Sequence, residues 1–261
     1  MSPDASVSGD RRAFHVKRSA REAFRRQLDA WGVKASREQL SLLEEYALLL
    51  AGYRRANVIG TREPETVLLE HVLDSASCLL FEPLRAAGRV ADVGSGGGLP
   101  GIPLKILLPE ARVVLIESTG KKADFLRYAI ESLGLSGVDV VNARVEAVAR
   151  EAAHRSRYDA ALARAVAALP VLAEYCVPLL RVGGHAVAMK GGMPEHELRL
   201  GEGAAAVLGA RLSGVLEVPR LPEVGEEKRR RLVILEKRRE TPGRYPRKAG
   251  VPAKRPLRGG G

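Results

Sequence analysis

The chain has 261 residues, 46% of them apolar, and its 42 lysines and arginines outnumber its 31 aspartates and glutamates to give a formal charge of +11. This length and apolar content exclude disorder throughout and predict one substantial domain with extensions, or two small domains. No apolar run approaches the roughly 18 residues of a membrane-spanning helix, and the first residues lack an apolar signal core, so we expect a soluble, cytoplasmic protein. The two cysteines, Cys78 and Cys176, are too few for a disulfide framework, and no cluster has metal-ligand spacing, so we expect no metal.

The basic residues gather near the two ends of the chain. Seven basic residues and one acid lie between Arg11 and Arg26, and six basic residues and no acid follow residue 240, together with four prolines and five glycines. This pattern predicts an anionic partner, with nucleic acid as the leading candidate and a solvated charged surface as the alternative. We expect a basic N-terminal arm over residues 1–22 and a disordered basic tail over residues 241–261.

Helical periodicity dominates residues 23–85. Apolar residues recur at helical spacing over about residues 20–50, which accommodate two helices, and Ser36 and Gln39 form the pattern of a capping box. A third helix is predicted over about residues 64–80. We therefore expect a helical cap ahead of the next domain.

Short β-rich runs alternate with helical ones from residue 88 to residue 190. This alternation predicts five parallel strands with helices on both faces of the sheet. A further helix is predicted to begin near Pro194, and β-rich runs over residues 215–221 and 229–238 predict an antiparallel pair at the sheet edge. Residues 86–240 therefore form an α/β domain with seven strands.

A glycine-rich turn lies where the first predicted strand meets the first helix of this domain, and it reads DVGSGGGLPG from Asp92 to Gly101. Glycine permits positive φ angles and close approach of a ligand at the carboxyl ends of parallel strands, so the turn predicts a cofactor site. The glycines also satisfy G-x-G-x-x-G, which would indicate a dinucleotide and an NAD-dependent oxidoreductase. Because Pro100 and Pro103 remove N–H groups that a pyrophosphate needs, the turn favours S-adenosylmethionine instead.

Two carboxylates accompany this turn. We expect Asp92 to serve the amino-acid end of S-adenosylmethionine, together with Gly96 and Gly98 in the turn itself. Glu117 ends the second predicted strand, where the ribose hydroxyls of either cofactor would lie, so it does not distinguish between them.

Four segments carry a resemblance to a known family, namely HVLDS from residue 71, DVGSGGGLPGIPL from residue 92, ARA from residue 163 and AMKG from residue 188. They resemble the glucose-inhibited division protein B family of small-subunit ribosomal RNA methyltransferases, over about residues 23–237. The resemblance implies the class I S-adenosylmethionine-dependent methyltransferase fold, a Rossmann-like sheet in the order 3-2-1-4-5-7-6. It also implies methylation of guanine N7 in the 530 loop of 16S ribosomal RNA. We expect a monomer that acts on this RNA or on the small-subunit particle.

The resemblance also implies a set of cofactor contacts. They are Gly94, Leu99, Glu117, Ser118, Thr119, Val145, Glu146 and Arg164.

The residues after the fourth predicted strand indicate which atom is methylated. Amino-group methyltransferases of this fold place Asn or Asp, two prolines and an aromatic residue there, whereas this chain reads ALARA from Ala161. Methylation of a pyrimidine carbon needs a cysteine nucleophile, and neither cysteine is placed for it. Guanine N7 carries a lone pair and no proton, so it needs alignment rather than a base.

Basic residues at the strand ends are the candidates for binding the guanine. We expect Arg164 and Lys190, assisted by Arg144, to hold the guanine O6 edge and neighbouring phosphates. His71 and Asp74 share a helix face and are expected either to close over the site or bind RNA, or to make a structural hydrogen bond. A non-catalytic RNA-binding assembly factor is the other interpretation, and the intact glycines disfavour it.

Overall fold

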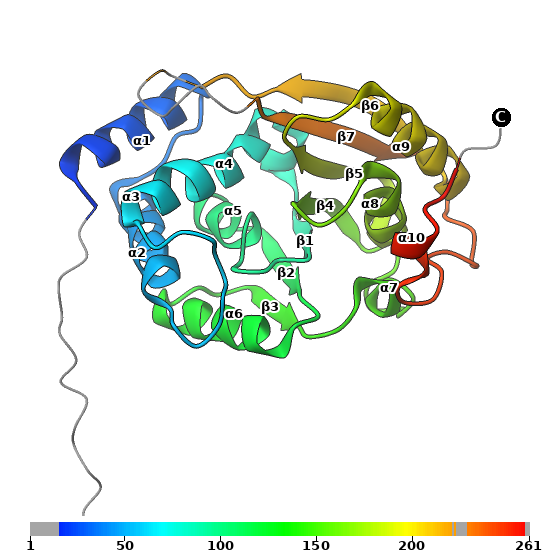
Figure 1. Ribbon diagram of the computed structural model, residues 1–261, viewed down its shortest axis with the longest axis horizontal. Helices are drawn as coiled ribbons and strands as arrows, with labels where there is room; N and C mark the ends of the chain where they lie inside the picture. Colours follow the sequence, from blue (N-terminus) through cyan, green and yellow to red (C-terminus); the bar gives the residue numbers. More distant parts are fainter. Residues whose placement is uncertain (1–15, 221, 223–228, 259–261) are drawn as a thin grey trace, which may run out of the picture.

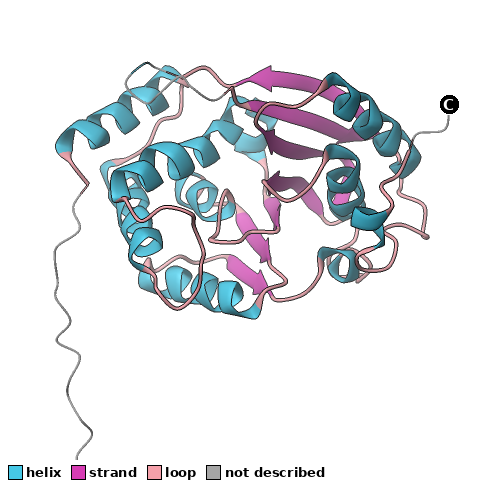
Figure 2. Ribbon diagram, viewed as in Figure 1, coloured by secondary structure: helices cyan, strands magenta, loops and turns pink. Residues whose placement is uncertain are grey.

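The computed structural model describes residues 16–220, 222 and 229–258, which form a seven-stranded sheet between two layers of helices (Figure 1, Figure 2). The strands are β1 (Arg89–Val93), β2 (Arg112–Ile116), β3 (Val138–Val141), β4 (Tyr158–Arg164), β5 (Leu180–Lys190), β6 (Ala210–Glu217) and β7 (Arg231–Lys237). Their order is β3-β2-β1-β4-β5-β7-β6, with β1 to β5 parallel and β7 antiparallel to both of its neighbours. The predicted strand order and antiparallel edge pair are thus confirmed.

Helices cover both faces of the sheet (Figure 1). The first face carries α1 (Arg18–Ala30), α2 (Arg37–Gly52), α3 (Pro64–Thr66), α4 (Leu73–Ala76), α5 (Gly101–Leu107) and α6 (Gly120–Ser132). The second carries α7 (Val145–Val148), α8 (Leu169–Cys176) and α9 (Glu195–Leu208), with α10 (Val251–Lys254) beside α7 and α8. In β2, Leu115 packs in the first layer, while Val114 and Ile116 pack in the second. Apolar side chains on both faces are what a buried parallel sheet requires.

The helices of the cap form as their sequence predicts. Ser36 Oγ accepts the N–H of Gln39 at 3.1 Å, and Gln39 Oε1 accepts the N–H of Ser36 at 2.8 Å, so the capping box begins α2. The third predicted helix is continuous over residues 64–80. It contains a π-helical turn, Val67–Val72, and ends as a 3₁₀ helix, Ser77–Leu80. A π-helical turn inside an α-helix is often found at functional sites.

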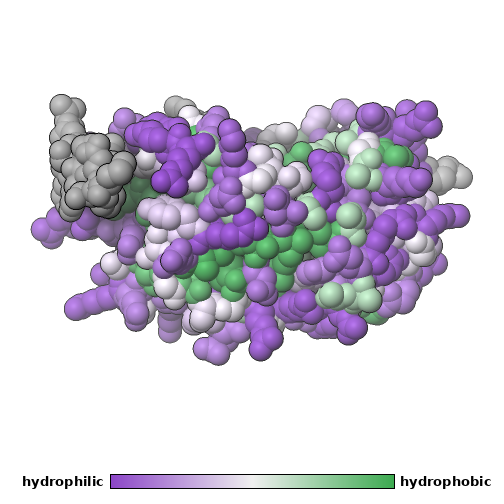
Figure 3. All heavy atoms as spheres, turned by 90° about the horizontal axis from the view of Figure 1, so that it is seen from below, coloured by the Kyte–Doolittle hydropathy of each residue, from purple (hydrophilic) through white to green (hydrophobic). Residues whose placement is uncertain are grey.

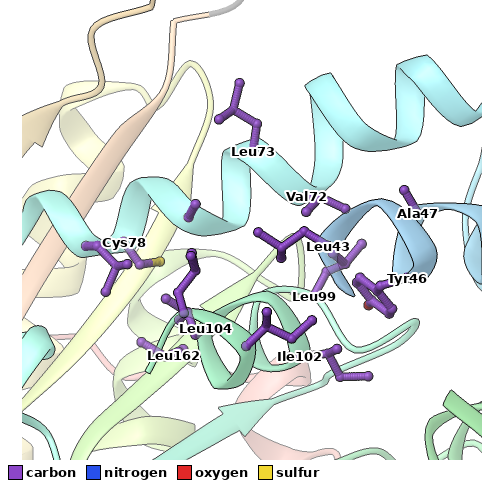
Figure 4. Close-up of a cluster of buried hydrophobic side chains, with 14 of the residues drawn as sticks. Leu43, Tyr46, Ala47, Val72, Leu73, Cys78, Leu99, Ile102, Leu104 and Leu162 are labelled. Atoms are coloured by element: carbon purple, nitrogen blue, oxygen red, sulfur yellow. The ribbon is translucent and has the colours of Figure 1, made fainter. Parts of the chain in front are cut away.

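The cap and the sheet share one hydrophobic core (Figure 4). Leu43 and Tyr46 from α2 and Val72 from the third helix pack against Ile102 of α5, and Leu162 of β4 lies in the same cluster. All five side chains are fully buried. The cap is therefore held against the sheet by the same apolar contacts that stabilise the sheet itself.

The C-terminal segment, residues 241–258, is ordered, and the prediction of a disordered tail is wrong for it. Tyr245 is only 8% exposed, and Arg247 pairs with the fully buried Glu174 of α8 at 2.6 Å. Composition suggested disorder because the basic residues have no local partners, but the fold supplies partners from distant parts of the chain. Residues 1–15 of the predicted N-terminal arm lie outside the described residues, and Arg18 already begins α1.

The edge strand β3 is only partly covered. Three of its four residues are half-buried, as expected for a strand with a neighbour on one side only. Figure 3 shows hydrophobic residues gathered on the side of the molecule where β3 and α6 lie. Within the described residues, no helix is long and apolar enough to cross a membrane.

Loss of the capping box should destabilise the cap. We expect Ser36→Ala to lower the free energy of unfolding by about 1 kcal/mol, because the N–H of Gln39 loses its acceptor. Urea unfolding monitored by circular dichroism measures the difference. Ser41→Ala is the matched control, since Ser41 is exposed within the same helix and should change stability by less than about 0.5 kcal/mol. Equal effects of the two substitutions would contradict this role of Ser36.

Candidate active site

The glycine loop, residues 94–101, leaves β1 at its carboxyl end and leads into α5. Gly94, Gly96 and Gly98 have φ angles of +71°, +56° and +90°, a region that favours glycine. A Cβ at Gly98 would lie 2.5 Å from Ile102, so α5 itself leaves no room for a side chain there. The loop is shaped by backbone conformation and by close packing together.

Asp92 lies beneath the glycine loop and supports it. Its Oδ2 accepts the N–H of Gly101 at 3.0 Å, and the residue is fully buried. Its Oδ1 has no hydrogen-bond partner among the described residues. Burial raises the pKa of Asp92 to about 7, although the Gly101 N–H opposes this rise. Expected to face the cofactor, Asp92 is instead absent from the lining of the two cavities found at this end of the sheet.

The first of these, the β1 cavity, has a volume of about 270 Å³. It is lined by Val93, Gly94, Ile116, Ser118, Ala143, Arg144, Val145, Val166, Ala167, Tyr175 and Ala253. Ligands of parallel α/β sheets bind at the carboxyl ends of the strands, and this cavity lies at the ends of β1, β2 and β4. Of the predicted cofactor contacts it contains Gly94, Ser118 and Val145.

Glu117 connects the glycine loop to the turn after β2. Its carboxylate accepts the N–H of Gly96 at 2.9 Å and the N–H of Thr119 at 2.7 Å. The residue is 6% exposed, so both bonds form away from bulk water. Glu117, Thr119 and Leu99 are among the lining residues of neither cavity; Glu117 and Thr119 instead position the loops that form the wall.

Glu146 and Arg144 form a pair at the start of α7. Glu146 is 1% exposed and accepts the N–H of Gly250 at 2.8 Å and a guanidinium N–H of Arg144 at 3.1 Å. Burial works against ionisation, but these two donors hold the pKa of Glu146 below its usual value. Arg144, expected beside the guanine, lies in the wall of the β1 cavity instead. The Arg144 guanidinium pairs with Glu146, and no pattern in the sequence indicated this ion pair.

The second cavity, the β5 cavity, also has a volume of about 270 Å³ and is strongly basic. It is lined by His71, Asp74, Ser77, Arg164, Ala165, Met189, Lys190, Gly191, Gly192, Val218, Arg230, Arg231 and Leu232. The predicted catalytic residues Arg164, Lys190 and His71 thus lie around one cavity. Five separate parts of the chain contribute to it: the cap, the end of β4, the end of β5, the residue after β6 and the start of β7.

A single four-residue segment separates the two cavities. In residues 164–167, Arg164 and Ala165 line the β5 cavity, whereas Val166 and Ala167 line the β1 cavity. Ala165 has a φ angle of +55°, which a residue other than glycine seldom adopts. Such strained backbone is concentrated at functional sites. Two ligands, one in each cavity, would face each other across this segment.

Arg164 is held by the cap. Its guanidinium donates to the carbonyl oxygen of His71 at 2.8 Å and contacts His71 Nδ1 at 2.7 Å. Asp74 Oδ2 lies 3.6 Å from the same guanidinium. Because an arginine side chain only donates, His71 Nδ1 is the acceptor and carries no proton. The structural hydrogen bond considered for His71 therefore exists, and it orients Arg164.

A network of charges behind the β5 cavity was not found from the sequence. Arg230 Nε lies 3.3 Å from Asp74 Oδ1, and both Arg230 and Arg220 lie within 4 Å of Glu70. The only signal in the sequence was the basic run that ends at Arg231. This network surrounds Asp74 with arginines and fixes the floor of the cavity.

A carboxylate on α9 orients the Lys190 side chain. Its Nζ lies 2.8 Å from Glu197 Oε1 and donates to the carbonyl oxygen of Ala167 at 3.1 Å. The Lys190 ammonium therefore reaches the segment between the two cavities. In the described part of the chain, no group of three potential metal ligands is present.

Comparison with known proteins identifies the family. A family model described as rRNA small subunit methyltransferase G matches residues 39–223. The chain belongs to this family. It is 99% identical over the full length of both chains to a ribosomal RNA small subunit methyltransferase G of Rubrobacter xylanophilus. It is 43% identical to the protein of the same name from Pelotomaculum thermopropionicum, covering 93% of this chain and 97% of that one.

Solved structures agree on the fold. A mutant of MtNAS in complex with S-adenosylmethionine matches 84% of this chain and 78% of its own, with a TM-score of 0.51 and 17% identity. With the strand order, this likeness gives the chain the fold of the class I S-adenosylmethionine-dependent methyltransferases. The oxidoreductase considered from the glycine pattern is therefore discarded.

The buried carboxyl of Asp92 should make stability depend on pH. The folded protein keeps a proton on Asp92 up to a pKa of about 7, whereas the unfolded chain loses it near 3.8, so the free energy of unfolding falls as pH rises between these values. The variant Asp92→Asn does not titrate there. It should gain about 2 kcal/mol relative to the unsubstituted protein between about pH 5 and pH 7.

Urea unfolding in the absence of cofactor measures this difference at each pH. Asp139→Asn is the control, because Asp139 is exposed on β3 and its substitution should change the free energy of unfolding by less than about 0.5 kcal/mol at each pH. A pH-independent difference for Asp92→Asn as well would show that Asp92 ionises normally in the folded protein.

Proposed function

We propose that the protein transfers a methyl group from S-adenosylmethionine to N7 of a guanine in the 530 loop of 16S ribosomal RNA. The observation that carries this proposal is the segment of residues 164–167, which borders a cavity beside the glycine loop on one side and a basic cavity on the other. A donor in the first and an acceptor in the second would face each other across this segment. Such alignment can supply several kcal/mol of the barrier.

The residues around the β1 cavity suit S-adenosylmethionine. Glu117 stands at the end of β2, where a carboxylate meets ribose hydroxyls in this class of fold. The buried Asp92 contributes to this site by accepting the N–H of Gly101, which holds the glycine loop beside the cavity. Gly94 lines this cavity, and a Cβ there would lie 2.7 Å from Val166 in the same wall, so the packing of the wall requires glycine. When bound, the cofactor supplies an electrophilic methyl group on a sulfonium sulfur.

The β5 cavity suits a guanine and its phosphates. A guanidinium has five N–H donors, and the contacts of Arg164 to His71 use two of its nitrogens on the cap side. We assign the remaining donors of Arg164 to guanine O6, which leaves N7 open to the methyl group. Lys190 and Arg230 then neutralise the neighbouring phosphates.

No residue needs to remove a proton in this reaction. Guanine N7 is an unprotonated acceptor of the methyl group, and His71 and Asp74 both lie against the Arg164 guanidinium. Their role is to orient Arg164. Arg144 pairs with Glu146 and lines the other cavity, so we assign it to the cofactor side.

Transfer of a labelled methyl group to 16S ribosomal RNA tests the reaction. We expect label in one guanine, located by strand cleavage specific for 7-methylguanine. Naked RNA, assembling particles and mature subunits should be compared, because each exposes this loop differently. Label in an amino group or a ribose would overturn the choice of N7, and absence of label in all three substrates would favour the assembly-factor interpretation.

Arg164→Ala should slow methyl transfer by about two orders of magnitude at saturating cofactor, because a preorganised donor to the guanine is lost. Single-turnover kinetics with labelled cofactor measures this rate. Arg164→Lys keeps the charge and the contact with the cap but loses the fork of donors, so it should also be slow.

Arg112→Ala is the matched control for these variants. Arg112 is exposed at the amino end of β2, away from both cavities, and its substitution should leave the rate unchanged. An Arg164→Ala protein that transfers the methyl group at the rate of the unsubstituted protein would remove Arg164 from the mechanism.

A further inference from the structure

The C-terminal segment, residues 241–258, is bound to the rest of the protein at several points along its length. Arg155, in the turn before β4, donates to the carbonyl oxygens of Thr241 at 2.8 Å and Tyr245 at 2.7 Å. Arg150 donates to the carbonyl oxygen of Arg244 at 3.1 Å. These bonds are made to the backbone of the segment, so they do not depend on which side chains the segment carries.

A buried ion pair anchors the middle of the segment. Glu174 of α8 is fully buried, and its carboxylate accepts the backbone N–H of Arg247 at 2.7 Å and guanidinium N–H groups at 2.6 and 2.9 Å. A buried carboxylate is costly without such a partner. The fold of α8 therefore depends on the presence of the segment.

The segment then reaches the cavity itself. The N–H of Gly250 binds Glu146, whose neighbour Val145 lines the β1 cavity, and three residues later Ala253 is part of the lining. Figure 1 shows α10, which contains Ala253, beside α7 and α8. Tyr175 of α8 belongs to the same lining. The segment thus contributes one wall residue directly and holds a second, Val145, through Glu146.

The lining that Ala253 shares includes positions where the adenosyl part of a cofactor lies in folds of this type. Ser118 and Ala143 follow β2 and β3, where the ribose and the base of a cofactor lie in folds of this type. All residues of the segment lie beyond residue 223, where the match to the family model ends. The cavity is therefore completed by a part of the chain that the family model does not include.

We propose that the C-terminal segment, through Ala253 and the Gly250–Glu146 hydrogen bond, forms part of the binding site for the adenosyl group of S-adenosylmethionine. This inference rests on the proposed function, since it takes S-adenosylmethionine as the cofactor. The segment provides apolar contact at Ala253 and fixes Glu146 and Arg144, which adjoin the same wall.

Ala253→Trp tests the wall directly. Ala253 is exposed but, unlike Ala249, belongs to the lining of the β1 cavity. An indole in its place would narrow the cavity, so we expect the dissociation constant of S-adenosylmethionine to rise at least tenfold, with the melting temperature unchanged. Isothermal titration calorimetry measures the binding without any need for activity. Ala249→Trp is the matched control, because Ala249 is exposed in the same segment and is not among the lining residues, so its affinity should be unchanged.

Methylthioadenosine, which lacks the amino-acid end, identifies the part of the cofactor that is affected. We expect Ala253→Trp to weaken its binding by the same factor as that of S-adenosylmethionine. Truncation after residue 240 should weaken the binding of both ligands further. If the truncated chain fails to fold, which the buried Glu174 would explain, the comparison of the two tryptophan variants still decides the matter.

The outcomes separate this inference from the proposed function. If the unsubstituted protein binds S-adenosylmethionine and Ala253→Trp binds it equally well, the segment is not part of the site. If Ala253→Trp weakens the binding of S-adenosylmethionine but not that of methylthioadenosine, the assignment to the adenosyl group is wrong. If the unsubstituted protein binds neither ligand, both the proposed function and this inference fail.

Discussion

The glycine loop has no room for side chains on its buried side, and the position of both cavities depends on this close fit. A Cβ at Gly101 would lie 2.4 Å from Leu115, so α5 is packed directly against β2. A Cβ at Gly94 would lie 2.7 Å from Val166, so the loop also determines where residues 164–167 run. The boundary between the two cavities thus follows from the packing of backbone against the sheet rather than from any single charged residue.

The charged groups at the β5 cavity are held in pairs, and the main effect of this pairing is orientation. Arg164 is bound by His71 and faces Asp74, and Lys190 is bound by Glu197. Partly buried ion pairs add little net stability, because the loss of hydration offsets their attraction. They do hold donors in place before a substrate arrives, which lowers the reorganisation needed during the reaction. The cap therefore supports the proposed chemistry through Arg164.

The high positive charge of the chain has two uses that composition does not separate. Arg155 and Arg247 are bound within the protein, where they hold the C-terminal segment against the second helix layer. Lys190 and Arg230 line the β5 cavity, where an anionic ligand would share them with Glu197 and Asp74. A net charge of +11 thus overstates the surface offered to RNA, because part of it compensates buried carboxylates such as Glu174.

The sequence by itself determined the alternation of strands and helices, the capping box at Ser36 and the glycine loop, because these depend on local periodicity and on backbone conformations that few residue types adopt. The strand order was implied by the resemblance to a known family. It also indicated Arg164 and Lys190 as neighbours of one site, since parallel strands end on the same edge of a sheet. Only the tertiary structure decided which way Asp92 faces, which cavity Arg144 lines and whether residues 241–258 are ordered. Those outcomes depend on partners distant in the chain, such as Glu146 and Gly250, 104 residues apart, which no local pattern can pair.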